Sequence, residues 1–181
     1  MRQRTPLRMR AVRLELLSAR LDHMAGELDA PERLSSLLDA EVPKSCLPGS
    51  TIATPWRISM SGGSRTDRPP WGGTGGMPSL VRRPRNRDAS SARGGYPGPP
   101  EPNGAVEIGS STAPERQGNG FATELAQAPV ERALTAPEVA RVVAHTTVEN
   151  VASVRVLERC GFAPMGPGAD VGTVRCEGAR C

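Results

Sequence analysis

Residues 114–124 read PERQGNGFATE, with a glycine on each side of one asparagine directly before a helical pattern. A helix N-terminus has unpaired backbone N–H groups and a partial positive charge, and both favour a bound phosphate. Gly118 and Gly120 permit sharp turns and let a ligand approach the backbone with no Cβ in the way. The stretch therefore predicts a phosphate-binding loop, although these two glycines alone are more typical of an ordinary turn.

The segments around this loop follow the order strand, loop, helix, strand and helix. The strands are predicted at residues 104–111 and 140–146, and the helices at residues 121–134 and 149–162. In the last helix Asn150 can cap the start and Gly161 the end. Asn103 and Gly104 form a turn signal that predicts a hairpin with the chain near Tyr96. This order predicts an α/β fold with adjacent parallel strands and a helix N-terminus at the carboxyl end of a strand.

Composition divides the chain into three regions. Residues 13–49 are orderly, with a short strand, an amphipathic helix capped by Ser18 and a second short helix that Pro31 opens. Residues 50–93 are more than half Arg, Gly, Ser and Pro, show no hydrophobic period, and are predicted to be disordered. Order returns in residues 94–181, which contain the glycine loop and both later helices.

Charge, cysteine usage and apolar content limit the classes of function. The 181 residues carry a net charge of +4, which suits anionic partners such as phosphates or nucleic acid without selecting one. The four cysteines lack C-x-x-C spacing and there are only two histidines, which argues against a zinc site. The sequence has no run of about 18 apolar residues that would predict a membrane span. We therefore expect a cytoplasmic protein with reduced thiols.

Two longer patterns resemble a known family. Residues 105–124 read AVEIGSSTAPERQGNGFATE, and residues 142–162 read VVAHTTVENVASVRVLERCGF. Together they resemble the GNAT superfamily of acyl-CoA N-acyltransferases, most closely its ribosomal-protein alanine and serine N-acetyltransferase branch. The first pattern contains the Q/R-x-x-G-x-G/A motif of that family, and the second contains its E-N-x-x-S-x-x-V-L-E-x-x-G-F signature. The resemblance implies an α/β (α+β) fold with a mixed sheet flanked by helices.

The resemblance also implies roles for individual residues, with acetyl-CoA as the acetyl donor. The diphosphate of the coenzyme would be held by the backbone amides of Gln117, Gly118, Asn119, Gly120, Phe121 and Ala122. The pantetheine arm would lie between two strands that splay apart, within hydrogen-bonding reach of Asn150. Ser153 would protonate the leaving thiolate, and Glu107 would deprotonate the attacking amine directly or through water. Such direct attack on a thioester needs no metal, and none is expected.

Each of these assignments has a structural alternative. Glu107 can be a solvated charge on a strand, Ser153 a packing residue, and Asn150 a helix cap. His145 is expected to be a hydrogen-bonded histidine in a buried strand rather than a catalytic group. The amine acceptor can be a protein N-terminus or a small molecule, and the protein can be a monomer or a homodimer.

Residues 50–93 depart from the family, because their composition predicts that the central strands are missing or disordered. Their length fits the family, so a pair of compensating frameshifts is one hypothesis for their origin. Pro129 also lies in the middle of a predicted helix, where the family has a helix former, at a cost of about 3 kcal/mol. One rival function is therefore an inactive relic that at most binds CoA. Another is nucleic-acid binding through the arginine-rich segment, where only Trp56 and Trp71 could stack on bases.

Overall fold

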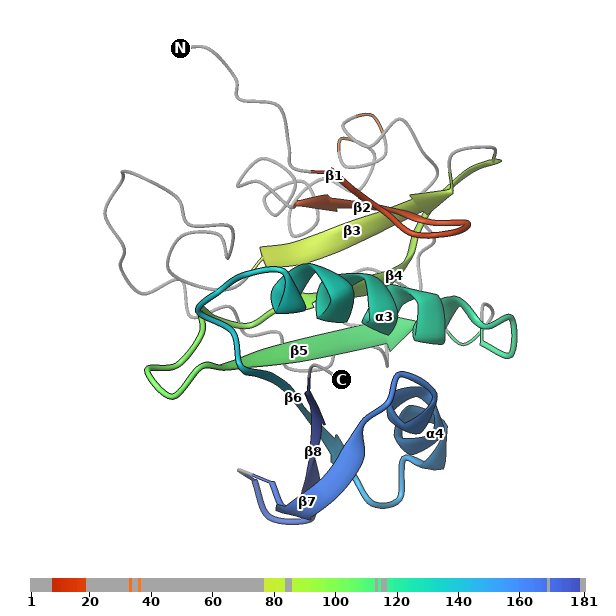
Figure 1. Cartoon of the computed structure of the whole chain (residues 1–181). Coiled ribbons are helices and arrows are strands. Elements are labelled where there is room, and N and C mark those ends of the chain that lie inside the picture. The colour runs from red at the N-terminus through yellow and green to blue at the C-terminus, as the bar shows by residue number, and fades with distance from the viewer. Residues whose placement is uncertain are drawn as a thin grey trace. The chain divides into compact units, whose positions relative to one another are not determined.

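The computed structural model describes residues 8–18, 33, 36, 77–83, 86–112, 114, 117–168 and 170–179. By its internal contacts the chain divides into two compact units. The first takes residues 1–57, 78–94 and 110–125, and the second takes residues 58–77, 95–109 and 126–181. The described strands are β1 (Arg8–Arg10), β2 (Glu15–Ser18), β3 (Met77–Arg83), β4 (Asn86–Tyr96), β5 (Ala105–Thr112), β6 (Arg141–Thr147), β7 (Ala163–Pro167) and β8 (Thr173–Ala179) (Figure 1). The helices that lie within the described residues over their whole length are α3 (Phe121–Leu134) and α4 (Val151–Arg159).

The first unit contains an N-terminal antiparallel hairpin followed by a third strand. Strand β1 pairs with β2, and β2 pairs with β3, so that Leu16 lies opposite Val81. Leu16 on β2 and Leu14, directly before this strand, are almost fully buried, as is usual for leucine. The sequence predicted a strand from residue 13, and the structure has that strand at Glu15–Ser18. The pairing of Arg8–Arg10 with it was not predicted.

The central strands differ from the sequence prediction. Residues 50–93 were expected to be disordered, with the central strands missing, but the structure has β3 at Met77–Arg83 and β4 at Asn86–Tyr96. The prediction therefore does not hold for the described part of that segment, and residues 50–76 lie outside the described residues. The physical reason is that strand pairing joins backbone N–H and C=O groups, so a strand rich in Ser and Arg can pair when its neighbour supplies the partners.

The sheet of the second unit places the parallel strands that the sequence predicted. Strand β5 pairs in parallel with β6, from Ala105 opposite Arg141 to Ile108 opposite Ala144. Strand β8 is antiparallel to β6 and also to β7. The ladder between β5 and β6 ends at Ile108 and Ala144, although β6 continues to Thr147 against β8.

This sheet has one apolar and one polar face, because side chains alternate along a strand. Residues from the apolar face pack with α3 and α4 in a buried core that contains Val106, Ile108, Val130, Ala133, Val142, Ala144, Leu157, Phe162 and Cys176. The alternate positions on β5, β6 and β8 include five polar side chains, which we define as the polar face: Glu107, Arg141, His145, Arg175 and Glu177. The buried Val143 lies among them on β6. Packing of the apolar face against the helices therefore fixes the position of the strands that carry the polar face.

Helix α4 begins and ends as the sequence predicted. The side-chain Oδ1 of Asn150 accepts a hydrogen bond from the backbone N–H of Ser153 at 3.1 Å, which is the geometry of an N-cap. At the other end Gly161 has φ +82°, its N–H donates to the Glu158 carbonyl, and the N–H of Phe162 donates to the Leu157 carbonyl. These two bonds form a Schellman motif, whose left-handed residue favours glycine.

Helix α3 accommodates the proline that was expected to destabilise it. Pro129 is fully buried within Phe121–Leu134, so the helix continues through it. The hydroxyl of Tyr96 donates a hydrogen bond of 2.6 Å to the Pro129 carbonyl. Burial raises the pKa of the Tyr96 phenol, and nearby Arg132 acts in the opposite direction. This buried bond offsets part of the free energy that the proline costs.

The turn before β5 also follows the sequence signal. The backbone N–H of Ala105 donates to the Asn103 side chain at 2.9 Å, and Gly104 has φ +76°. A Cβ added at Gly104 would lie 3.0 Å from that of Ala140, so only glycine fits this approach. The two helices predicted before residue 49 lie outside the described residues, except that Arg33 and Ser36 are described and are helical.

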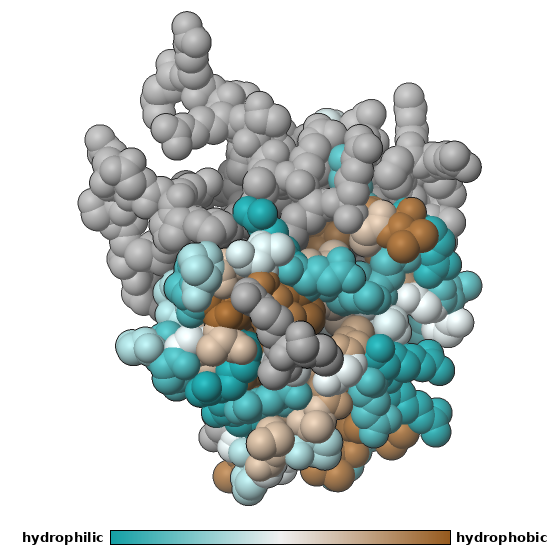
Figure 2. Space-filling model, viewed as in Figure 1, coloured by the Kyte–Doolittle hydropathy of each residue, from teal (hydrophilic) through white to brown (hydrophobic). Residues whose placement is uncertain are grey.

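The exposed apolar side chains are scattered among polar ones. In Figure 2 hydrophobic and hydrophilic residues are interspersed over the coloured part of the visible face. The large exposed apolar residues of the second unit are Val148, Val151, Met165 and Val171. Within the described residues no helix has the length and apolar character needed to cross a membrane.

Candidate functional site

The glycine loop, residues 117–120, makes a sharp turn directly before α3. Gly118 and Gly120 each have φ +76°, a left-handed conformation that side chains other than glycine rarely adopt. The first helical hydrogen bond runs from the N–H of Glu124 to the Gly120 carbonyl at 3.2 Å. All four loop residues are exposed. The backbone therefore needs both glycines to reach the start of the helix in this conformation.

This loop leaves backbone donors available at the head of α3. No described residue accepts a hydrogen bond from the N–H of Gly118, Gly120 or Ala122. The side chains of the loop instead bond to the chain itself, since Gln117 Nε2 donates to the Thr112 carbonyl and Asn119 Nδ2 donates to the Gln117 carbonyl. Loop and helix start thus offer amide hydrogens and the positive end of the helix dipole to an anion.

An arginine from the N-terminal hairpin holds this loop. The Arg13 guanidinium donates through Nη2 to the Asn119 carbonyl at 3.0 Å and through Nε to Glu124 Oε2 at 2.9 Å. It also lies over the Phe121 ring, 4.6 Å from the ring centroid. The backbone N–H groups of Arg13 and Leu14 both donate to Glu124 Oε1. Five contacts therefore connect the turn after β1 to the loop and the first turn of α3.

These contacts have two consequences for an anion site. In a planar trans peptide the C=O and the following N–H point in opposite directions, so fixing the Asn119 carbonyl also fixes the Gly120 N–H. The Glu124 carboxylate lies in the first turn of α3, where its charge opposes a bound anion, and Arg13 neutralises it. Sequence reasoning missed both residues. An acidic residue in a first helical turn is a usual pattern, and Arg13 is 111 positions from its partner Glu124.

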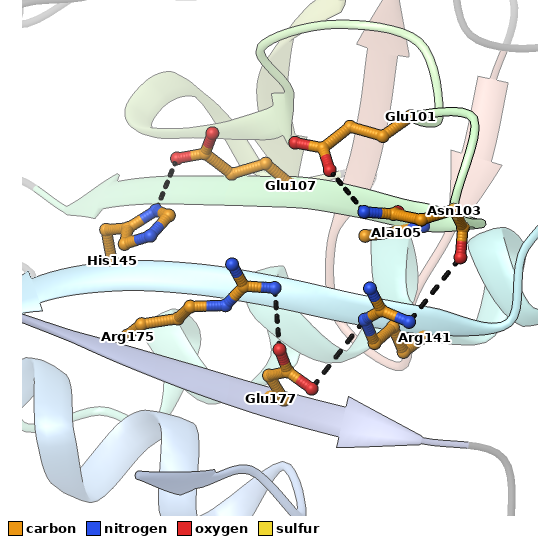
Figure 3. A network of polar contacts seen from close by, with 8 residues as sticks. All are labelled: Glu101, Asn103, Ala105, Glu107, Arg141, His145, Arg175 and Glu177. Atoms are coloured by element: carbon orange, nitrogen blue, oxygen red, sulfur yellow. Dashed lines mark hydrogen bonds and ion pairs between the residues drawn. The ribbon is translucent and has the colours of Figure 1, made fainter. Parts of the chain in front are cut away.

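The polar face brings Glu107 and His145 together (Figure 3). Nδ1 of His145 lies 3.1 Å from Oε1 of Glu107, with the two side chains 24% and 46% exposed. Glu107 is opposite Val143 in the parallel ladder, so His145 lies two residues further along the neighbouring strand. The prediction that His145 makes a hydrogen bond is thus confirmed. His145 nevertheless belongs to the polar face and is only partly buried, because its position alternates with the core residues Ala144 and Thr146.

The other charges of the polar face are paired among themselves. Arg175 Nη2 lies 2.6 Å from Glu177 Oε1, and Arg141 Nε lies 3.7 Å from Glu177 Oε2. Arg141 Nη1 also donates to the Asn103 carbonyl at 3.4 Å. Figure 3 shows this group on the same side of the strands as Glu107 and His145. Glu177 is therefore neutralised by two arginines, and the histidine and Glu107 form a separate pair.

Asn150 and Ser153 come together at the start of α4. The cap bond between them uses Asn150 Oδ1, so the amide nitrogen Nδ2 of this exposed residue remains for another partner. Ser153 is half-buried. The alternative interpretation of Asn150 as a helix cap is confirmed, and binding of pantetheine by the same side chain stays a prediction.

The described cysteines form no disulfide, and their thiols are partly buried in Cys160 and buried in Cys176. Burial raises the pKa of the Cys160 thiol, and burial together with the Glu158 carboxylate raises that of Cys176. Neither thiol has the lowered pKa of a nucleophilic cysteine. No cluster of three or more histidine, cysteine or acidic side chains that could hold a metal occurs in the part of the chain that the structure describes.

A family model for the acetyltransferase (GNAT) domain matches residues 73–163, half of the chain. The chain belongs to the GNAT acetyltransferase family. This match confirms the family resemblance that the glycine loop and the α4 segment indicated. It also includes β3 and β4, where composition had argued against family strands.

Individual relatives support the same family over part of the chain. An uncharacterized N-acetyltransferase of Bacillus subtilis (strain 168), YjdG, is 35% identical over 68 residues. That match covers 38% of this chain and 40% of the relative, so the chain spans about two fifths of the curated relative's length.

Solved structures share the fold. The ribosomal-protein-S5-alanine acetyltransferase of Vibrio fischeri has a TM-score of 0.51 at 19% identity, over 57% of this chain and 61% of that one. A spermidine N-acetyltransferase of Vibrio cholerae, solved with CoA and spermine, has a TM-score of 0.50 at 21% identity, over 57% and 64%. At these identities the likeness concerns the fold alone, and it confirms the predicted mixed α/β class.

Proposed function

We propose that this protein transfers an acetyl group from acetyl-CoA to a primary amine. The observation that carries the proposal is the glycine loop, whose backbone donors lie at the head of α3 within a GNAT domain. The backbone at residues 117–122 binds the diphosphate of the coenzyme, because the positive end of the helix dipole and the available N–H groups of Gly118, Gly120 and Ala122 favour an anion. Arg13 supports this by keeping the nearby Glu124 carboxylate neutralised.

The reaction is direct attack of the amine on the thioester. The end of the β5–β6 ladder at Ile108 and Ala144 supports a pantetheine arm inserted where the strands stop pairing. Asn150 donates to that arm through Nδ2, and Ser153 returns a proton to the leaving thiolate. The Glu107 carboxylate on β5 supports removal of the amine proton. Positioning the two substrates supplies much of the rate.

The acceptor is a small-molecule amine or a protein N-terminus. Solved relatives named for spermidine, aminoglycoside and ribosomal-protein alanine acetylation share the fold, so both acceptor classes belong in the test. The described cysteines, Cys160 and Cys176, form no disulfide, and this supports a location in the reducing cytoplasm.

Calorimetric titration with acetyl-CoA, followed by a thiol-release assay over a panel of amines, tests this function. The panel contains spermine, kanamycin and a peptide with an N-terminal alanine. We expect acetyl-CoA to bind and at least one amine to release CoA thiol above the rate of hydrolysis. Binding without turnover would indicate the inactive relic instead. A folded sample that ignores millimolar acetyl-CoA would show that the glycine loop has another purpose.

A further inference from the structure

The Glu107–His145 pair lies at the point where β5 and β6 stop pairing. The β5–β6 ladder ends at Ile108 and Ala144. Glu107 comes one residue before that end on β5, and His145 comes one residue after it on β6. Their side chains meet on the polar face, across the two strands (Figure 3). An acyl group inserted where these two strands part, as the proposed function requires, would lie beside this pair.

The hydrogen bond assigns the two imidazole nitrogens different roles. An ionised carboxylate can only accept, so the proton of a neutral His145 ring lies on Nδ1, which donates to Glu107. The tautomer is inferred from this partner. Nε2 then carries a lone pair, and no described residue donates to it. The buried side-chain polar atoms without a partner in the described chain are Thr112 Oγ1 and Arg175 Nε, so Nε2 is not enclosed.

The ring is held from a second side as well. A Cβ built at Gly168 would lie 3.2 Å from His145 Cδ2, so the backbone there packs closely against the ring edge. Arg175, the cross-strand neighbour of His145, is committed to Glu177 at 2.6 Å. The histidine thus has a fixed orientation, one hydrogen-bonded nitrogen and one available nitrogen, which is the arrangement of a base oriented by a carboxylate.

We propose that His145 Nε2 is the general base of the acetyl transfer and that Glu107 is its positioning residue. The inference rests on the proposed function and deepens it, with His145 taking the amine proton in place of the Glu107 carboxylate. The amine nitrogen forms a bond to the thioester carbonyl carbon, and its proton passes to Nε2. The C–S bond then breaks, and its electron pair leaves on the CoA sulfur, which takes a proton from Ser153 or from the imidazolium. The products are the N-acetyl amine and the free CoA thiol.

Three variants separate this role from a structural one. His145→Asn keeps a donor near the Nδ1 position but has no base at Nε2, and His145→Ala removes the ring. We expect both to lower kcat/KM by about 10²- to 10⁴-fold, the usual contribution of a general base. Acetyl-CoA affinity should stay within about twofold. Added imidazole should restore turnover in His145→Ala. Glu107→Gln should lose about tenfold, because it keeps an acceptor for Nδ1, and imidazole should not restore it.

The outcomes distinguish the possible failures. If wild type binds acetyl-CoA but turns over no amine, the proposed function fails and this inference fails with it. If wild type is active and His145→Asn keeps a third or more of its kcat/KM, or if imidazole does not restore His145→Ala, His145 is not the base. A larger loss in Glu107→Gln than in His145→Asn assigns the base to Glu107. Nitrogen NMR of the imidazole at pH 8 gives an activity-independent readout: an Nε2–H tautomer overturns the inference.

Discussion

The glycine loop and the polar face of the sheet present different kinds of chemistry. In the loop the available groups are backbone N–H groups, which two left-handed glycines and Arg13 hold in place. On the polar face the available groups are side chains, which the register of β5, β6 and β8 brings together. A backbone site depends on residues that lack a Cβ, whereas a side-chain site depends on the identity of each partner. The two regions should therefore fail under different substitutions.

The largest expected effect in the loop comes from Gly118→Val. Gly118 has φ +76°, and a Cβ there would meet no atom within 4 Å, so the substitution acts through backbone conformation rather than through a clash. A β-branched residue held at this φ costs of order 1–3 kcal/mol, which corresponds to about a 5- to 150-fold loss of acetyl-CoA affinity if the loop relaxes. Calorimetric titration measures it.

Gly98→Val is the matched control. Gly98 also has open space around the position of a Cβ, but its φ is not in the left-handed region. Its acetyl-CoA affinity should stay within about twofold of wild type. If acetyl-CoA affinity falls equally in the two variants, binding does not depend on the left-handed conformation of Gly118. The loop would then not be a site that depends on backbone conformation.

The parts of the fold that sequence predicted are those determined by local patterns. Helix α4 begins at the Asn150 cap and ends at the Gly161 Schellman motif, because both signals act within one helical turn. The glycine loop is a local signal too, and its family motif continues directly into α3. Helix α3 has the predicted bounds even though Pro129 lies inside it. Buried packing and the Tyr96 bond, which the sequence does not show, accommodate that proline.

The contacts that sequence missed depend on register or on distant segments. Glu107 and His145 meet only because the parallel ladder pairs Glu107 with Val143, and a shift of one residue would send one of them to the core face. Arg13 reaches Asn119 from a hairpin more than 100 positions earlier. The composition of residues 50–93 argued against strands β3 and β4. Strand pairing uses backbone groups, so it need not show in the side-chain composition of a segment.

A smaller effect is expected for Arg13→Gln. The variant loses the charge that neutralises Glu124 and weakens the hold on the Asn119 carbonyl. Arg13 is about half exposed, so we expect acetyl-CoA affinity to fall by only about 3- to 10-fold. S-acetyl-pantetheine, which lacks the diphosphate, should be used as well by the variant as by wild type. Steady-state kinetics with the two donors makes the comparison.

The double variant Arg13→Gln/Glu124→Gln sharpens this result. Removing the Glu124 carboxylate also removes the repulsion that the lost arginine had balanced, so acetyl-CoA affinity should return at least halfway on a logarithmic scale. If both donors weaken equally in Arg13→Gln, the residue supports the fold of the hairpin rather than the diphosphate site.

The smallest effect separates two roles within one side chain, Asn150. Asn150→Ala removes the acceptor for the Ser153 N–H and should lower stability by about 0.5–2 kcal/mol, a thermal shift of about 1–8 °C. Asn150→Asp keeps the cap, because aspartate is an equally good N-cap, but it loses the Nδ2 donor. If the amide also binds pantetheine, Asn150→Asp should keep the thermal midpoint of wild type and bind acetyl-CoA more weakly. If Asn150→Asp is as stable as wild type and binds acetyl-CoA equally well, Asn150 serves only as a helix cap. The asparagine at this position would then be explained by the start of α4 alone, without a contact to the coenzyme.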